Sequence, residues 1–171
     1  MATTYEPIAT TTLTSNNTVD FTSIPQTYTD LVLVANVRGA RADTIDILNI
    51  NFNSDTSSIY SYTYMYGTGS TAGSFGLGNP SVGYIGIEYI VAANEAANCF
   101  TPVIMHFNNY SNTTTYKTAI VRNDIAQNRT SATVGLWRST SAISSIQLKG
   151  QLTSNLATGS TFTLYGIKAA I

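Results

Sequence analysis

Three ingredients of many catalytic and secreted proteins are scarce in this chain: cysteine, histidine and charged side chains. A single cysteine, Cys99, excludes an internal disulfide and fits assembly in a reducing cytosol. Charged residues make up 10% of the 171 residues and the formal net charge is −1, whereas globular domains average about 25% charged residues. Without a basic excess there is no electrostatic attraction to nucleic acid or to an anionic membrane, so neither is expected as a partner.

Long apolar runs and targeting signals are lacking as well. No stretch approaches the roughly 18 consecutive apolar residues that a membrane-spanning helix needs. The first residues, Met1–Tyr5, contain neither the basic nor the apolar region of a secretory signal. These absences predict a protein that is neither exported through a leader nor inserted in a membrane.

What the chain has in abundance is short polar side chains placed between apolar ones. Thr, Ser and Asn supply about a third of the residues, and 43% of the residues are hydrophobic. The alternation has the period of two that is typical of β-strands, and the helical period of 3.6 is nearly absent. It predicts strands at Ile8–Leu13, Val19–Phe21, Asp30–Val37, Thr44–Phe52, Ile59–Tyr66, Val82–Val91, Phe100–Phe107, Tyr116–Arg122, Ala132–Arg138, Ile143–Leu148 and within Ala157–Ala170.

Strands of this number and spacing predict an all-β fold: one antiparallel β-sandwich domain over residues 1–171, jelly-roll-like, with about ten strands. Asp30–Val37 is apolar on both faces, as in a strand that is covered on both sides. In Thr44–Phe52 the apolar positions change face, which predicts a bulge near Leu48. Trp137 is expected to anchor the core rather than to lie on the surface.

Two segments are predicted to depart from the strand pattern. Gly67–Pro80 contains five glycines and is expected to form a long flexible loop. Val91–Cys99 is the one stretch rich in Ala and Glu, and it is expected to hold a short helical turn.

Side chains for catalysis or metal binding are few. His106 is the one histidine and the Gly-x-Ser-x-Gly motif is absent, so a hydrolase triad is not expected. Asp46 and Glu88 are the acids that fall inside strands, and they form the best carboxylate pair for a glycosidase. Asn51–Asp55 spaces oxygen ligands as a calcium loop does but lacks the later glycine and glutamate, so it is interpreted as a turn. We predict no catalytic residue, no cofactor and no metal, and therefore no enzyme.

A tyrosine stripe is the best candidate for a binding surface. Tyr60, Tyr62, Tyr64 and Tyr66 share one face of the strand predicted at Ile59–Tyr66. Exposed rings in a row could stack on sugar rings, and tyrosine is also enriched at protein–protein interfaces. Ordinary core packing is the third interpretation, and the sequence leaves all three open.

Several short sequence motifs in the chain are similar to those of a known family. They include a Phe-Thr-Ser-Ile-Pro-Gln-Thr-Tyr-Thr-Asp-Leu entry into the first long strand and a Phe-Asn-Ser-Asp block followed by Tyr-Ser-Tyr-Thr. The chain thereby resembles small, Thr-rich virion proteins of tailed bacteriophages, especially phages of aquatic bacteria such as cyanophages. The segments that carry the resemblance are Ile8–Leu13, Phe21–Leu31, Phe52–Asp55, Tyr60–Thr63, Asn109–Thr118, Gly135–Ile143 and Ala157–Ala170.

The resemblance implies a non-enzymatic virion structural protein, in the first place an outer capsid decoration, or cement, protein with a jelly-roll-like sandwich. The alternative is a tail fibre or spike component, or a receptor-binding module that recognises host surface polysaccharide through the tyrosine face or the Gly67–Pro80 loop. The expected partners are further copies of the chain, as a homotrimer, and other virion proteins such as the major capsid protein; in the alternative, a host glycan. The expected location is the outer surface of the particle, after assembly in the host cytoplasm.

Overall fold

The computed structural model describes residues 4–125, 129–151 and 155–168, and this part of the chain is built from twelve β-strands. The strands are β1 (Tyr5–Thr12), β2 (Val19–Phe21), β3 (Asp30–Val37), β4 (Ile45–Phe52), β5 (Tyr60–Gly67), β6 (Ala72–Val82), β7 (Ile85–Val91), β8 (Thr101–Phe107), β9 (Lys117–Ile125), β10 (Arg129–Trp137), β11 (Ile146–Gly150) and β12 (Thr161–Ile167). Among the described residues there is no helix that could cross a membrane.

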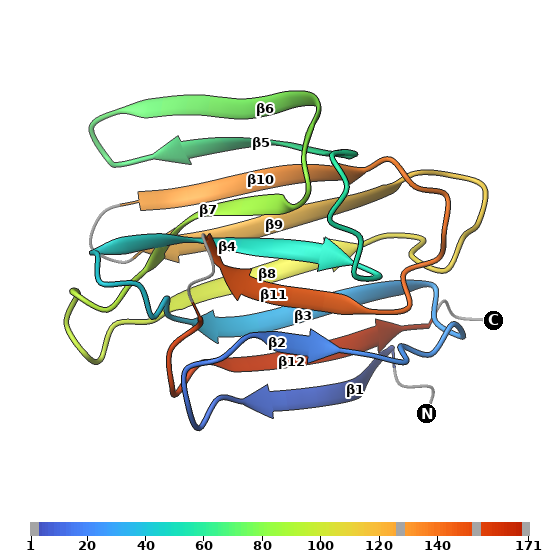
Figure 1. Cartoon of the computed structure of the whole chain (residues 1–171), viewed down its shortest axis with the longest axis horizontal. Helices are drawn as coiled ribbons and strands as arrows, with labels where there is room; N and C mark the ends of the chain where they lie inside the picture. The colour runs from blue at the N-terminus through green and yellow to red at the C-terminus, as the bar shows by residue number, and fades with distance from the viewer. Residues whose placement is uncertain (1–3, 126–128, 152–154, 169–171) are drawn as a thin grey trace.

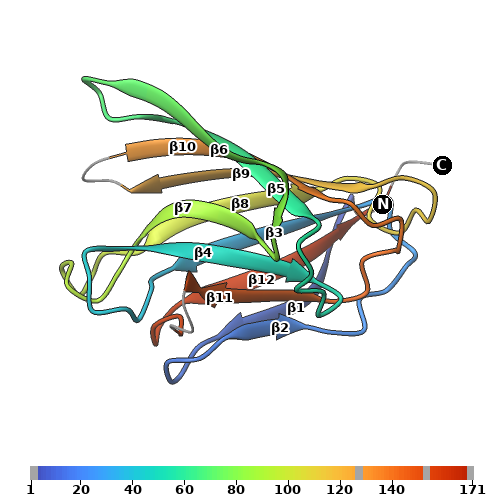
Figure 2. The same cartoon turned by 45° about the horizontal axis from the view of Figure 1, so that its top comes forward.

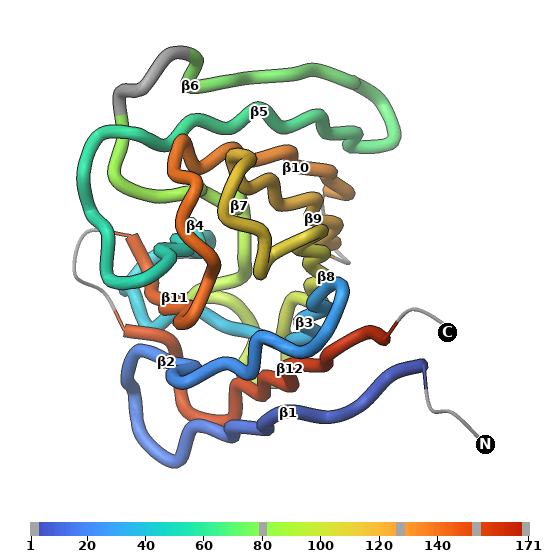
Figure 3. The backbone as a smooth tube through the Cα atoms, turned by 90° about the vertical axis from the view of Figure 1, so that its right-hand side faces the viewer, coloured from blue at the N-terminus to red at the C-terminus, as the bar shows by residue number. Residues whose placement is uncertain are grey.

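The strands form two antiparallel sheets that face each other. The large sheet has eight strands in the order β1-β12-β3-β8-β9-β10-β5-β6, and the small sheet has four in the order β2-β11-β4-β7. Figure 1 shows the small sheet in front of the large one, and Figure 3, taken from the side, shows the two layers. The apolar side chains between them form one core. The predicted antiparallel β-sandwich is therefore confirmed.

Most of the predicted strands are confirmed to within a few residues. β2 and β3 have the predicted bounds. A bulge is present at the predicted position, where the pairing of β4 with β7 shifts register between Asp46 and Leu48, but it does not lie in the strand for which it was predicted. The extra residue belongs to β7, where Glu88 and Tyr89 lie opposite a single residue of β4. One predicted strand, Val82–Val91, is in fact the end of β6 followed by β7.

The prediction of a flexible loop at Gly67–Pro80 is wrong. Most of this segment belongs to β6, which pairs with β5 from Ala72 onward. Its glycines were mistaken for a loop signal, although Gly73 has a packing role. A Cβ atom at Gly73 would lie 2.8 Å from the hydroxyl of Tyr66, so glycine leaves room for the tyrosine ring beside the strand.

The helical turn predicted in Val91–Cys99 is also wrong, because this segment forms successive tight turns. The buried side chain of Arg38, which is 7% exposed, holds this segment in place. Its guanidinium donates hydrogen bonds of 2.6–3.1 Å to four backbone carbonyls, those of Ala93, Glu95, Ala96 and Cys99.

β12 lies inside the large sheet, between β1 and β3. Phe162 and Leu164 are fully buried toward the small sheet, and the odd-numbered residues of the strand face the other way, as the alternation predicts. Residues 169 and 170 of the predicted strand lie outside the described residues. β12 therefore joins strands from the beginning of the chain and is the sole neighbour of β1 in the sheet.

Trp137 is 2% exposed and lies at the centre of an aromatic group, so its predicted core position is confirmed. Its ring stacks on Tyr60 with 6.1 Å between centroids and contacts Phe52 at 5.5 Å. The indole Nε1 donates a hydrogen bond of 2.9 Å to Asp55 Oδ2. The ring thus fills the space between the sheets while its one polar atom is satisfied at the edge of the core.

Replacing this ring should be costly. We expect Trp137→Ala to lower the free energy of unfolding by about 3–5 kcal/mol, because it removes a large buried aromatic group and leaves a cavity. Urea denaturation measures the loss. Val134→Ala is the matched control: Val134 lies on the same strand, points away from the core and is 54% exposed, so its loss should stay within about 0.5 kcal/mol. Equal losses for the two variants would contradict the assignment of Trp137 to the core.

Removing residues 158–171 should make the chain aggregate. Without β12, β1 loses its partner strand and β3 presents an unpaired edge with exposed backbone donors and acceptors. Solubility after expression and light scattering measure the effect, and deletion of residues 169–171 alone is the control. A truncated chain that is as soluble as the full one would show that β12 is dispensable.

Candidate functional site

The four tyrosines of the predicted stripe lie on the face of β5 that points toward the small sheet. Tyr60, Tyr62 and Tyr64 are 0%, 4% and 5% exposed, and Tyr66 is half-buried near the end of the strand. A row of four exposed rings is therefore not present, because the small sheet and its flanking loop cover three of them. These three rings pack in the core, and Tyr66 is the member of the stripe that reaches the surface.

Burial of Tyr62 places its hydroxyl beside an acid. The hydroxyl donates a hydrogen bond of 3.0 Å to Glu88 Oε1. Gly86 allows β7 to pass over the ring, since a Cβ atom there would lie 2.7 Å from it. Burial raises the pKa of Tyr62, and the Glu88 charge adds to this effect; burial also raises the pKa of Glu88 itself. Glu88 is 7% exposed, so the pair is a buried hydrogen bond rather than an acid and base open to a substrate.

An aromatic–arginine cluster surrounds Tyr66. We define it as Tyr64, Tyr66, Phe75, Tyr89 and Arg129, contributed by β5, β6, β7 and β10. The guanidinium carbon of Arg129 lies 3.8 Å from the ring centroid of Tyr89 and 4.3 Å from that of Tyr66. The ring of Tyr64 contacts those of Tyr66, Phe75 and Tyr89 at 5.9–6.2 Å. The cluster joins one cation to four aromatic rings.

The cluster reaches solvent because the large sheet is wider than the small one. β7 is the edge of the small sheet and packs on β5, β9 and β10. Figure 2 shows the β5–β6 hairpin extending beyond β7. Phe75, on this extension, is 50% exposed. The inner face of the hairpin is thus an accessible continuation of the core.

The outer face of the large sheet, which points away from the small sheet, is the second candidate surface. Two rows of cross-strand neighbours form its centre across β3, β8, β9, β10 and β5. The first row is Val32, His106, Ile120, Val134 and Thr63, and the second is Val34, Ile104, Arg122, Ala132 and Met65. Five of the seven large hydrophobic side chains that are exposed in the described residues lie on this face: Tyr5, Val34, Met65, Ile120 and Val134. The centre of the outer face therefore exposes several apolar side chains among polar ones such as Thr63, Arg122 and Thr130.

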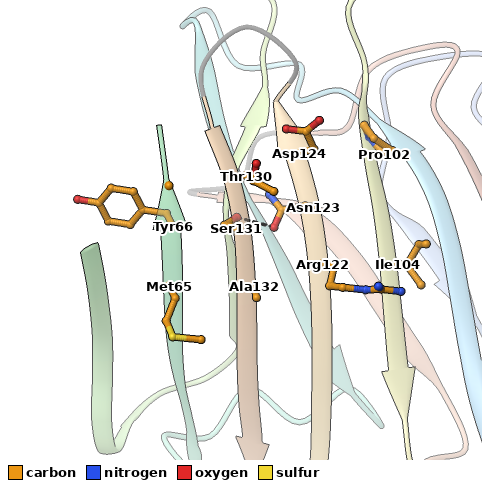
Figure 4. A pocket seen from close by; sticks show the side chains of 11 residues that line it. Met65, Tyr66, Pro102, Ile104, Arg122, Asn123, Asp124, Thr130, Ser131 and Ala132 are labelled. Carbon is orange, nitrogen blue, oxygen red and sulfur yellow. Dashed lines mark hydrogen bonds between the residues drawn. The ribbon is translucent and has the colours of Figure 1, made fainter. Parts of the chain in front are cut away.

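An open groove of about 540 Å³ lies at one end of the outer face, over β5, β10, β9 and β8. Met65, Ile104 and Ala132 line it with apolar groups, and Arg122 and Asp124 supply one charge of each sign. In Figure 4 the Arg122 side chain extends across the sheet toward Ile104. The groove suits an apolar protrusion with a polar group beside it.

The sequence held a signal for the outer face that was interpreted incompletely. Asp30–Val37 is apolar on both faces, which predicts cover on both sides. The chain covers the inner side fully, whereas on the outer side Val32 is 4% exposed and Val34 is 41% exposed. The sequence does not point to Phe75 or Arg129 as site residues, because Phe75 falls in the predicted loop and Arg129 falls in a predicted turn before the strand at Ala132–Arg138.

The residues considered for catalysis do not come together. His106 lies on the outer face between Val32 and Ile120, and in the part of the chain described its imidazole has no hydrogen bond to a serine or a carboxylate. Asp46 is 2% exposed and packs against Gly39, while Glu88 faces Tyr62. The two carboxyl groups thus have separate surroundings, and neither borders the groove.

In the oxygen-rich segment Asn51–Asp55, the side chains of Asn53 and Asp55 accept hydrogen bonds from protein donors, whereas the buried Oδ1 of Asn51 has no partner. Asn53 Oδ1 accepts hydrogen bonds from the backbone N–H groups of Ser144 and Ser145. Burial alone would raise the pKa of Asp55, but hydrogen bonds from Ser57 and Trp137 outweigh it and lower the pKa. Within the described ranges no group of three or more His, Cys, Asp or Glu residues is placed to hold a metal ion. The segment acts as a turn that ties β4 to the core.

No protein-family model matches the sequence, and no curated protein matches it either. One similar solved structure is a mutant of the alginate lyase Aly36B in complex with an alginate tetrasaccharide: 10% identity, 95% of this chain and 81% of that chain covered, TM-score 0.31. Another is the legume lectin-like domain from Entamoeba histolytica: 9% identity, 98% of this chain and 85% of that chain covered, TM-score 0.26. At these TM-scores the likeness supports no conclusion about function.

Asp46 should make stability depend on pH. Burial raises its pKa, against hydrogen bonds from the N–H groups of Ile47 and Gln151, and its Oδ2 has no hydrogen-bond partner. The folded state therefore holds a proton that the unfolded state has lost, so stability falls as the pH rises from the unfolded pKa of about 3.9 through the raised pKa. We expect the stability of Asp46→Asn relative to the wild type to increase between about pH 3.5 and pH 7 in urea titrations.

Asp124→Asn, at an exposed position of β9, is the control for this pH series. Its stability relative to the wild type should change little over the same range. A difference between Asp46→Asn and the wild type that stays constant with pH would contradict the role of Asp46.

Proposed function

We propose that this chain is a non-enzymatic structural protein of a bacteriophage particle, an outer capsid decoration protein that docks on the shell through the outer face of the large sheet. The observation that carries the proposal is the group of apolar side chains exposed at the centre of that face. Exposed large side chains normally occur singly on a soluble protein, and a contiguous patch marks a protein-interaction surface. The resemblance to phage virion proteins supplies the biological setting.

The size of the outer face suits a stable interface. Eight strands about 4.8 Å apart and side-chain rows over roughly 20 Å of strand give an area of about 700 Å². A standard protein–protein interface buries about 800 Å² on each partner. Covering this face would also give β3 the two-sided cover that its sequence predicts.

The proposed occupant is a different protein, the shell protein, rather than a second copy placed face to face. Arg122 lies near the middle of the apolar rows, between Ile104 and Ala132. Overlaying two copies about the centre of this face would bring two guanidinium groups together in a desolvated interface, which is unfavourable. A shell surface with an apolar protrusion and a carboxylate would instead pair with Arg122. Self-association, as a trimer, is proposed to use other surfaces of the sandwich.

Purified particles of the phage that encodes the chain provide the test. Quantitative mass spectrometry should find copies in the hundreds, as expected for a capsid component, rather than about a dozen, as expected for a tail. Recombinant protein should co-sediment with particles that lack it, and Ile120→Glu or Val134→Glu should weaken this binding by about tenfold or more, because each puts a charge into the buried centre.

Lys149→Glu is the control for the docking variants. Lys149 lies on β11 and points away from the core on the other side of the sandwich, so the change adds negative charge without touching the outer face. Binding of this variant should equal that of the wild type. Particles without the protein, or unchanged binding of both outer-face variants, would refute the proposal.

A further inference from the structure

We propose that the aromatic–arginine cluster binds a carboxylate-bearing sugar of an acidic glycan, with Arg129 holding the carboxylate and Phe75 stacking on a sugar ring. The cluster lies on the inner face of the β5–β6 hairpin, and the outer face lies on the opposite side of the same strands. The inference therefore adds a second binding function to the proposed one and does not depend on it.

Arg129 is a cation with unused donors. Its guanidinium packs over the rings of Tyr66 and Tyr89, and it forms no ion pair and no side-chain hydrogen bond with any of the described residues. A guanidinium has five N–H donors in one plane, which match the two oxygens of a carboxylate. Because the two rings already hold the guanidinium in place, Arg129 loses little conformational entropy when a ligand binds. Arg129 is thus positioned to receive an anion from outside the chain.

The nearest acid in the fold does not fill this role. Glu88 accepts the hydrogen bond of Tyr62 and lies beyond ion-pair distance of Arg129, although the Arg129 charge acts to lower the Glu88 pKa that burial raises. The two charges attract each other without touching. No acid among the described residues therefore pairs with the guanidinium, and Arg129 is half-buried rather than fully enclosed.

Phe75 provides the apolar half of the site. It is 50% exposed and is held by the ring of Tyr64, which lies directly opposite it on β5. An exposed ring that is held in place by a second ring can stack on the C–H face of a sugar. A neutral glycan would make no use of Arg129, and a small inorganic anion would make no use of Phe75, so the pairing favours a sugar acid.

The backbone at Tyr89 indicates that this arrangement is built into the fold. Tyr89 has a φ of 64°, in the left-handed region that few non-glycine residues adopt. It lies in the bulge of β7, and bulges redirect side chains and cluster near functional sites. Here the bulge turns the Tyr89 ring onto Arg129, which fixes the cation at the end of the sandwich.

Isothermal titration of the full chain provides the test, with oligogalacturonate, oligoalginate, hyaluronan fragments and a sialylated oligosaccharide as probes. At least one should bind the wild type, and the same probe after reduction of its carboxyl groups to hydroxymethyl groups should bind about tenfold more weakly or less. Arg129→Gln should cause a loss of similar size. Arg129→Lys should recover part of the affinity, because it restores the charge without the planar donors.

Phe75→Ala is the variant that does not risk the fold, since half of its ring is already in solvent; it should weaken binding of the same probe by about fivefold or more. Arg122→Gln and Tyr116→Ala, a cation on the outer face and an aromatic ring that is 56% exposed elsewhere, should leave affinity unchanged. Ile120→Glu should lose docking but keep sugar binding, which separates the two proposals.

The inference would be overturned by no binding of any acidic probe, by equal affinity of the wild type and Arg129→Gln, or by equal affinity for the acidic probe and its carboxyl-reduced form. An oligosaccharide that carries sulfate esters but no carboxylate, and that binds more tightly than every carboxylated probe, would also overturn the inference, because the assigned group is a carboxylate.

Discussion

The fold depends on one mismatch, the packing of a four-stranded sheet against an eight-stranded one. The small sheet supplies the inner half of the core, but it can cover only one face of the large sheet and only part of its width. Burial of apolar area on that side stabilises the chain. The same geometry leaves the outer face without cover and carries the β5–β6 hairpin past β7. Both candidate surfaces are therefore consequences of how the core is closed, rather than additions to it.

Charged residues are few, and four of them, Arg38, Asp46, Glu88 and Lys117, are buried. Lys117 is 1% exposed, and its ammonium donates to the backbone carbonyls of Thr115 and Thr140, while burial lowers its pKa. Arg38 holds the loop after β7 in the same way. In the described ranges the two recorded ion pairs, Arg41–Asp43 and Glu6–Lys168, lie at the surface. Buried cations here therefore fix loops through carbonyl dipoles, which avoids the cost of also burying a counter-ion.

The sequence was sufficient for the fold class and for most strands, because alternation of apolar and polar residues directly reports which face of a strand is buried. β3, the faces of β12 and the core position of Trp137 followed from it. It failed at β6, where Gly73, which makes room for the ring of Tyr66, looks the same as a glycine of a loop. It also could not locate the aromatic–arginine cluster, since Phe75, Tyr89 and Arg129 meet only through sheet pairing and a bulge. The sequence places Tyr60, Tyr62, Tyr64 and Tyr66 on one face of a strand. It does not tell how many of these rings are buried, because that depends on how far the opposite sheet extends over the strand.

The central position of β12 has a consequence for how the chain reaches its folded state. β1 and β3 are made early and share β12 as a neighbour, although it lies more than a hundred residues further along the chain. Until residues 161–167 have been synthesised, β1 has no partner in the large sheet, and β3, which pairs with β8 on its other side, presents an open edge. A topology with such distant partners folds slowly, because a long loop must close before the contacts form. The nascent chain therefore passes through a stage with open sheet edges, when association with a neighbouring copy or a chaperone competes with completion of its own sheet.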